Sequence, residues 1–214
     1  MNLGKQRKKS LLIWGSLSFI FCSSIYLVSN FLASKQNIHY PIYLEFERSI
    51  PLIPWMIYVY ISLGALLILN LIILKDPKVI KRFAICLIVT ALIAGTIFVL
   101  FPGKLGFHRT IDIPGYSWIF SLLHKVDQPF NLYPSLHICY SYLTVSALID
   151  QTKNKLLHVC LMVWLLLIGC SVVLVHQHHL FDIFSGLALG ILVFKLVYKN
   201  QLNRIEEILQ ARQN

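Results

Sequence analysis

The chain has 214 residues, of which 57% are hydrophobic and 13% are charged, and its mean hydropathy is +0.70. A soluble domain is typically about half apolar and about a quarter charged, so this composition excludes an ordinary soluble protein and indicates an integral membrane protein. The formal charge of +10 does not indicate a nucleic-acid partner, because the basic residues lie in short segments between long apolar runs.

Six apolar runs predict six transmembrane helices, and therefore an all-α polytopic membrane protein. These runs cover residues 11–33, 52–74, 83–101, 134–149, 156–175 and 180–198. The first run follows a basic segment, residues 1–10, and a secretory signal peptide is the alternative for it; its length and the lack of a clear cleavage site favour a helix. We expect residues 1–199 to form one membrane domain and residues 200–214 to form a cytoplasmic tail.

The connection over residues 102–133 is long, and such connections are usually functional or disordered. Its content of Pro, Gly, Trp and Phe predicts a packed loop with a short interfacial helix near residues 116–124. Asp127 and Asn131 are expected to shape its end. The aromatic residues at span ends are interpreted as interfacial anchors: Trp55, Trp118 and Tyr133.

The distribution of basic residues predicts the orientation. If the N-terminus is cytoplasmic, the inner segments hold 14 of the 19 lysine and arginine residues, which agrees with the positive-inside rule. Both termini are then cytoplasmic, and the 102–133 connection lies on the outer side. The start of the fourth span and the turn before the sixth also face outward, so we expect His137 and His178 on the same side at similar depth.

A cluster of ionisable residues interrupts the apolar sequence between the fifth and sixth spans. Within seven residues it holds His176, His178, His179 and Asp182. Such residues at the edge of a membrane span are costly, which makes them functional candidates. If the helix includes residues 178–182, His178 and Asp182 stand one turn apart on one face. A carboxylate there can fix the tautomer of the imidazole and leave its other nitrogen as a nucleophile or base.

A second motif, Pro134-Ser135-Leu136-His137, opens the fourth span. It resembles the P-S-x-H motif of the type-2 phosphatidic acid phosphatase superfamily, and residues 171–182 resemble that family's S-R-x5-H-x3-D motif. The order of the motifs and the six-helix bundle are also similar to the family, over nearly the whole chain. The resemblance therefore implies a membrane lipid phosphatase or phosphotransferase.

Carried onto this chain, the resemblance implies a role for each matching residue. His178 would attack phosphorus and form a phosphohistidine, and Asp182 would orient it. His137 would protonate the leaving oxygen and then activate water. Ser135 would hold phosphate oxygens together with backbone N–H groups at a helix start. No metal and no cofactor is expected.

The chain departs from the family pattern at the positions that bind phosphate. The arginine that follows Ser171 in the family is Val172 here, and Lys104 and Arg109 match the K-x6-R-P motif only loosely. The third motif resembles the branch of inositol phosphorylceramide synthases, with His176 where that branch usually has lysine. Protonated His176 could restore positive charge. We expect phosphate contacts from Ser135, Lys104, Arg109, His176 and Ser171.

The predicted function is hydrolysis of a phosphomonoester or pyrophosphate of a membrane lipid on the outer face. The substrate classes considered are undecaprenyl pyrophosphate, phosphatidylglycerol phosphate and phosphatidic acid. One alternative is a phosphotransferase that passes a phospho-headgroup to an alcohol. A catalytically silent lipid-phosphate binder is the other, motivated by Val172 and the loose lysine–arginine motif.

The remaining histidines and the cysteines have simpler interpretations. A zinc site built from His176, His178 and Asp182 is an alternative for the cluster. His179 is expected to be a packing or interfacial residue. Interfacial positions are expected for the other histidines: His39, His108, His124 and His158. The five cysteines lie inside apolar runs without zinc-ligand spacing and are interpreted as small packing residues: Cys22, Cys86, Cys139, Cys160 and Cys170.

Overall fold

In a computed structural model, which describes residues 3–199, the chain is helical and has no β-strand within that range. The expected cytoplasmic tail over residues 200–214 lies outside the described residues. The elements, in chain order, are α1 (Leu3–Ser34), the 3-10 helix η1 (Glu45–Ser49), α2 (Met56–Ile61), α3 (Leu63–Ile73), α4 (Pro77–Leu100), α5 (Ser117–Val126), α6 (Leu136–Gln151), α7 (Lys155–Leu174), α8 (Leu180–Val193) and the π-helix η2 (Phe194–Lys199).

Five of these helical segments are long and apolar enough to cross a membrane. They are α1, α2 with α3, α4, α7, and α8 with η2. The predicted fourth span is α6, which has only 16 residues, whereas a membrane span needs roughly 20. The all-α polytopic architecture is therefore confirmed, and the count of six spans is approximate.

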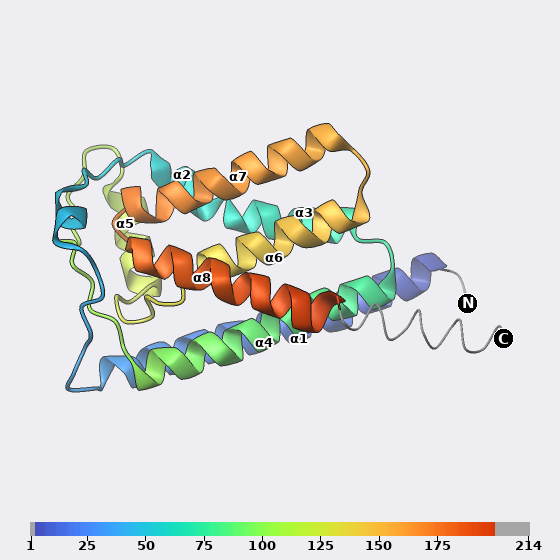
Figure 1. Cartoon of the computed structure of the whole chain (residues 1–214), viewed down its shortest axis with the longest axis horizontal. Coiled ribbons are helices and arrows are strands. Elements are labelled where there is room, and N and C mark those ends of the chain that lie inside the picture. The colour runs from blue at the N-terminus through green and yellow to red at the C-terminus, as the bar shows by residue number, and fades with distance from the viewer. Residues whose placement is uncertain (1–2, 200–214) are drawn as a thin grey trace.

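The helices run roughly alongside one another, and the two long connections gather at one end, whereas the short α3–α4 and α6–α7 loops lie at the other (Figure 1). α1 begins and η2 ends at the opposite end of the bundle. The loop end holds the first connection with η1, the second connection with α5, and the short turn between α7 and α8. The starts of α6 and α8 therefore lie at the same end, as the predicted topology requires. Which side of the membrane this end faces remains a prediction.

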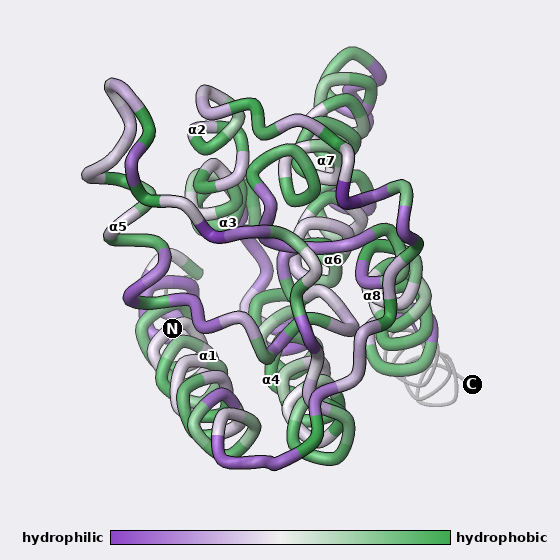
Figure 2. Tube along the Cα trace, turned by 90° about the vertical axis from the view of Figure 1, so that its left-hand side faces the viewer, coloured by the Kyte–Doolittle hydropathy of each residue, from purple (hydrophilic) through white to green (hydrophobic). Residues whose placement is uncertain are grey.

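Apolar side chains cover the outer surface of the bundle. The hydropathy colouring shows mostly apolar helices behind a loop end that mixes polar and apolar segments (Figure 2). α1 packs chiefly on α4 and leaves large apolar side chains uncovered, among them Phe19 and Phe31, which are 74% and 61% exposed. An exposed apolar surface of this extent suits a helix that faces lipid.

The basic N-terminal segment is helical, contrary to the expected start of the first span at residue 11. Its helix begins at Leu3, and Arg7 explains the extension. The Arg7 guanidinium donates hydrogen bonds to the carbonyl oxygens of Leu71 and Leu74, at 2.6 and 3.0 Å. These carbonyls lie at the end of α3, where a helix leaves acceptors without partners. A contact distant in sequence thus extends the helix.

The second predicted span is broken near Ser62, where α2 ends and α3 begins. The Ser62 hydroxyl donates to the carbonyl of Val59 at 2.6 Å and accepts from the indole N–H of Trp164 at 2.8 Å. This contact ties the break to α7. It also fixes the orientation of α2, whose last turn carries Tyr60 into the loop end.

Candidate active site

The turn between α7 and α8 places His178 and Asp182 against each other. The backbone N–H of His178 donates to the carbonyl of Val172 at 2.9 Å, which closes the end of α7. α8 begins at Leu180, as expected for the sixth span, so His178 precedes the helix and does not share a helical face with Asp182. The pair forms by helix capping instead. The Asp182 carboxylate accepts from the backbone N–H of His179 at 2.9 Å and from Nδ1 of His178 at 3.1 Å.

This geometry determines which nitrogen of His178 is free to react. The side chains of His178 and Asp182 are only 6% and 1% exposed. Because Asp182 accepts from Nδ1, that nitrogen carries the proton and Nε2 keeps its lone pair. Among the residues that the structure describes, Nε2 of His178 has no hydrogen-bond partner. The pair thus orients the imidazole and leaves Nε2 without a partner among the described residues.

His137 is a neighbour of the His178 ring. It is the second residue of α6, and its ring centroid is 6.3 Å from that of His178. The two helices are joined just behind the rings, where the backbone N–H of Ser135 donates to the carbonyl of Asp182 at 3.0 Å. Gly186 permits this close approach, because a Cβ there would lie 2.7 Å from the Ser135 carbonyl oxygen. The two histidines predicted to act together are therefore neighbours.

Ser135 caps the start of α6 and is fully buried. Within residues 3–199 its hydroxyl has no hydrogen-bond partner. An unpaired buried hydroxyl is costly, and an oxygen atom of a bound ligand would relieve the cost. The helix start beside it adds backbone N–H groups and a positive dipole end. The arrangement suits a phosphate oxygen.

Arg109 reaches the same region from the second connection. Its guanidinium donates to the backbone carbonyl of Asp127 at 2.5 Å and lies 3.5 Å from the side-chain oxygen of Gln177, the residue before His178. Burial lowers the pKa of Arg109, and the negative charge of Asp127 opposes that shift. With Lys104, Arg109 also lines a surface pocket of about 570 Å³. His137 and His178 do not line this pocket. Arg109 does line it, and it also contacts Gln177, next to His178.

Two other expected phosphate contacts are directed elsewhere. The Ser171 hydroxyl is buried and donates to the carbonyl of Ile168 at 2.7 Å. The His176 ring stacks on Phe107, with centroids 4.1 Å apart, and its Nε2 donates to the carbonyl of Ile50 at 2.9 Å. Burial lowers the pKa of His176, so this ring is neutral near pH 7. His176 therefore does not replace the positive charge of the family arginine, at whose position this chain has Val172.

The alternative of a zinc site has no matching arrangement in the described part of the chain. No group of three or more His, Cys, Asp or Glu side chains is placed there to hold a metal ion. His178 and Asp182 do meet, but His176 turns toward Ile50. The three residues considered for that alternative therefore do not converge.

Sequence reasoning missed a second carboxylate–histidine pair beside the first. Glu47, from η1, is fully buried, and it accepts from Nδ1 of His179 at 3.2 Å and from the backbone N–H of Leu180 at 2.8 Å. Nε2 of His179 accepts from the backbone N–H of Gly106 at 2.9 Å. Both ring nitrogens are thus occupied, and burial lowers the pKa of this histidine. The pair joins both connections to the turn that carries His178.

Replacing Glu47 with alanine should destabilise the loop end. The change leaves buried N–H groups without an acceptor, which costs about 1–3 kcal/mol for each group. We therefore expect the Tm of the detergent-solubilised protein to fall by roughly 5–10 °C. Glu45→Ala is the matched control, because Glu45 is in the same short helix but its side chain is 81% exposed. Equal Tm values for the two variants would contradict the role assigned to Glu47.

A known family matches the part of the chain that carries these residues. The model described as the PAP2 superfamily matches residues 83–206, more than half of the chain. The matched range runs from α4 past the end of α8 and contains His137, His178 and Asp182. No curated protein matches the chain.

Proposed function

We propose that this chain, which belongs to the PAP2 superfamily, removes phosphate from a membrane lipid through a phosphohistidine formed on His178. Family membership supports lipid-phosphate chemistry of the phosphatase or phosphotransferase type in a multi-pass membrane protein. The observation that carries the specific proposal is the His178–Asp182 pair, which leaves Nε2 free and whose imidazole ring lies 6.3 Å from that of His137, centroid to centroid.

In the first step, Nε2 of His178 attacks phosphorus, and the bond from phosphorus to the leaving oxygen breaks. Asp182 stabilises the positive charge that develops on the imidazole through its bond to Nδ1. The leaving oxygen needs a proton, and protonated His137 is the neighbouring group that can donate one. The products of this step are a lipid alcohol, or a shorter lipid phosphate, and the phosphohistidine.

In the second step, water attacks phosphorus and the phosphorus–nitrogen bond breaks. His137, now neutral, takes a proton from that water and returns to the form in which the cycle began. His178 recovers the lone pair on Nε2, and inorganic phosphate is released. One histidine therefore acts as acid and then as base, while the other carries the phosphoryl group.

The phosphate oxygens need donors while charge moves across the site. Ser135 with the start of α6, together with Arg109, supplies them in this proposal. Lys104 shares the adjoining pocket and is assigned to the outer part of the headgroup. Ser171 and His176 are left out, because their polar atoms bond to backbone carbonyls.

The bilayer is the source of the substrate in this proposal. The site lies at one end of the bundle, where helix ends meet the loops, and a lipid headgroup occupies the same depth in a membrane (Figure 1). The charge distribution along the chain favours the outer leaflet. Phosphatidic acid, phosphatidylglycerol phosphate and undecaprenyl pyrophosphate are the classes to compare.

The test is phosphate release by the purified protein from those three lipids, combined with trapping of the intermediate. A radiolabelled phosphoryl group should be found on the peptide that contains His178, in a form stable to alkali and labile to acid. Parallel reactions with a chelator and with an added alcohol extend the test. Release lost with chelator would support a metal-dependent reaction instead.

The lack of a basic side chain at position 172, which is valine, favours transfer of a phospho-headgroup to an alcohol as the second candidate function. Val172 is fully buried, so one of the family's phosphate contacts has no counterpart at that position. Product formed only when an alcohol is present would identify a phosphotransferase. Lipid binding with neither release nor transfer would identify a silent binder and overturn the proposal.

A further inference from the structure

Asp127 receives two phenol groups from different helices. It follows α5 directly, and its carboxylate accepts from the hydroxyl of Tyr26 on α1 and from that of Tyr60 on α2, the latter at 3.0 Å. Its backbone carbonyl accepts from Arg109 at 2.5 Å. Asp127 thus contacts both tyrosines and Arg109. Arg109 in turn lies beside Gln177, the residue before His178.

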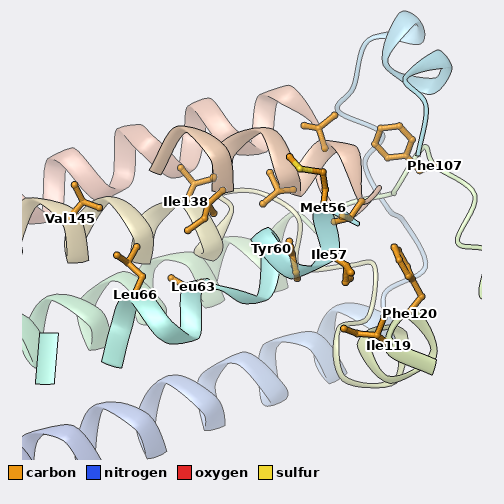
Figure 3. Close-up of a cluster of buried hydrophobic side chains, with 14 of the residues drawn as sticks. Met56, Ile57, Tyr60, Leu63, Leu66, Phe107, Ile119, Phe120, Ile138 and Val145 are labelled. Carbon is orange, nitrogen blue, oxygen red and sulfur yellow. The ribbon is translucent and has the colours of Figure 1, made fainter. Parts of the chain in front are cut away.

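Tyr60 connects this group to His137. The two rings are stacked, with centroids 4.0 Å apart and planes 23° from parallel. Tyr60 is 2% exposed and lies on α2 among the apolar core side chains (Figure 3). The ring therefore has little freedom: core residues surround it, and its hydroxyl is bound to Asp127.

His137 depends on packing for its orientation. Within residues 3–199 its ring makes no hydrogen bond, and the rings it meets are those of Tyr60 and His178. This differs from His178, which a carboxylate holds. A ring without a hydrogen-bond partner keeps both nitrogens available, but it needs another group to fix its plane.

We propose that Tyr60, held by Asp127, is a positioning residue that orients His137 for both proton transfers. The inference rests on the proposed function, because it assumes that His137 serves first as acid and then as base. Both tasks require a nitrogen aimed at the oxygen position opposite the phosphorus–nitrogen bond, which the leaving oxygen and then the attacking water occupy, without a partner that would compete for the proton. Stacking fixes the plane of the imidazole and leaves its nitrogens free. The hydrogen bond from the Tyr60 hydroxyl to Asp127 holds the Tyr60 ring in its position against His137.

Three variants separate positioning from a general effect on the fold. Tyr60→Leu removes the stack, Tyr60→Phe removes only the bond to Asp127, and Tyr26→Phe removes the equivalent bond on the other oxygen of the same carboxylate. Tyr26 makes no ring contact with His137, so its variant controls for the loss of one phenol from Asp127. Tm values of all three report on stability separately.

The measured quantity is the rate at which water releases phosphate from preformed phosphohistidine in a single turnover. We expect Tyr60→Leu to slow this step by roughly 30–100-fold and Tyr60→Phe by about 3–10-fold, because small displacements of catalytic groups are costly. Tyr26→Phe should stay within about twofold of the wild type. Phosphohistidine should then accumulate in the Tyr60 variants at steady state, and kcat should become similar for substrates with different leaving groups.

The outcomes separate this inference from the proposed function. Phosphohistidine that forms in the wild type but decays equally fast in the Tyr60→Phe and Tyr26→Phe variants would overturn the positioning role and leave the proposed function intact. Failure to form phosphohistidine in the wild type would overturn both. If Tyr60→Leu does not fold, the comparison of the two phenylalanine variants still decides the question.

Discussion

Replacing His178 with alanine is expected to reduce phosphate release by at least about 10⁴-fold, because the reaction loses its nucleophile. The same change should abolish the labelled intermediate. The change removes the bond from Nδ1 to Asp182, but Nε2 has no partner in the described part of the chain and Asp182 keeps its bond to the backbone of His179, so Tm should fall less than in His179→Ala. The measurements are phosphate release from the preferred lipid and Tm in the same detergent.

The adjacent His179 supplies the matched control. It also pairs with a buried carboxylate, but its second nitrogen accepts from Gly106 and its ring lies against Tyr43 and Phe107. His179→Ala should therefore lower Tm by roughly 5–10 °C and reduce activity by no more than about tenfold. If activity were lost in His179→Ala and kept in His178→Ala, the nucleophile would be His179 and the proposed assignment to His178 would be wrong.

The contrast between the two histidines shows what sequence could and could not predict. His178 and Asp182 were found because their spacing of four residues is local and places both groups at one helix start. Glu47 is 132 residues from His179. It lies in a polar loop where nothing in the local pattern marks it as buried, so only the folded chain shows which carboxylate holds His179.

The meeting of His137 and His178 was predicted for a different reason. Counting spans assigns the starts of the fourth and sixth helices to the same end of the bundle, and the structure places them there (Figure 1). Tyr60 could not be found in this way. It stands in an apolar run as one of several large side chains, and its two contacts come from distant parts of the chain.

The helix bounds were predicted where composition alone decides them and missed where a tertiary contact or a helix cap does. The fifth span was expected over residues 156–175, and α7 covers Lys155–Leu174. The first helix begins eight residues earlier than expected because Arg7 binds the end of α3. α4 begins at Pro77, because the Asp76 side chain caps it by accepting from the backbone N–H of Lys78 at 2.8 Å.

The His137→Ala variant is expected to lose about 10³-fold in lipid phosphate hydrolysis, within the range of 10²–10⁴ that general acid–base groups contribute. The loss should depend on the leaving group. A lipid alkoxide needs a proton as it departs, whereas a nitrophenolate does not. With p-nitrophenyl phosphate the first step should proceed in the variant and stop at the phosphohistidine, because water then lacks its base.

The mechanism requires that His137→Ala give a burst of one equivalent of nitrophenol per protein. Slow release of phosphate should follow the burst. His178→Ala should give no burst with the same substrate, since the phosphoryl group has no acceptor. If His137→Ala lost the burst as well, His137 would be needed for attack rather than for proton transfer. The division of labour proposed for the two rings, whose centroids lie 6.3 Å apart, would then be wrong.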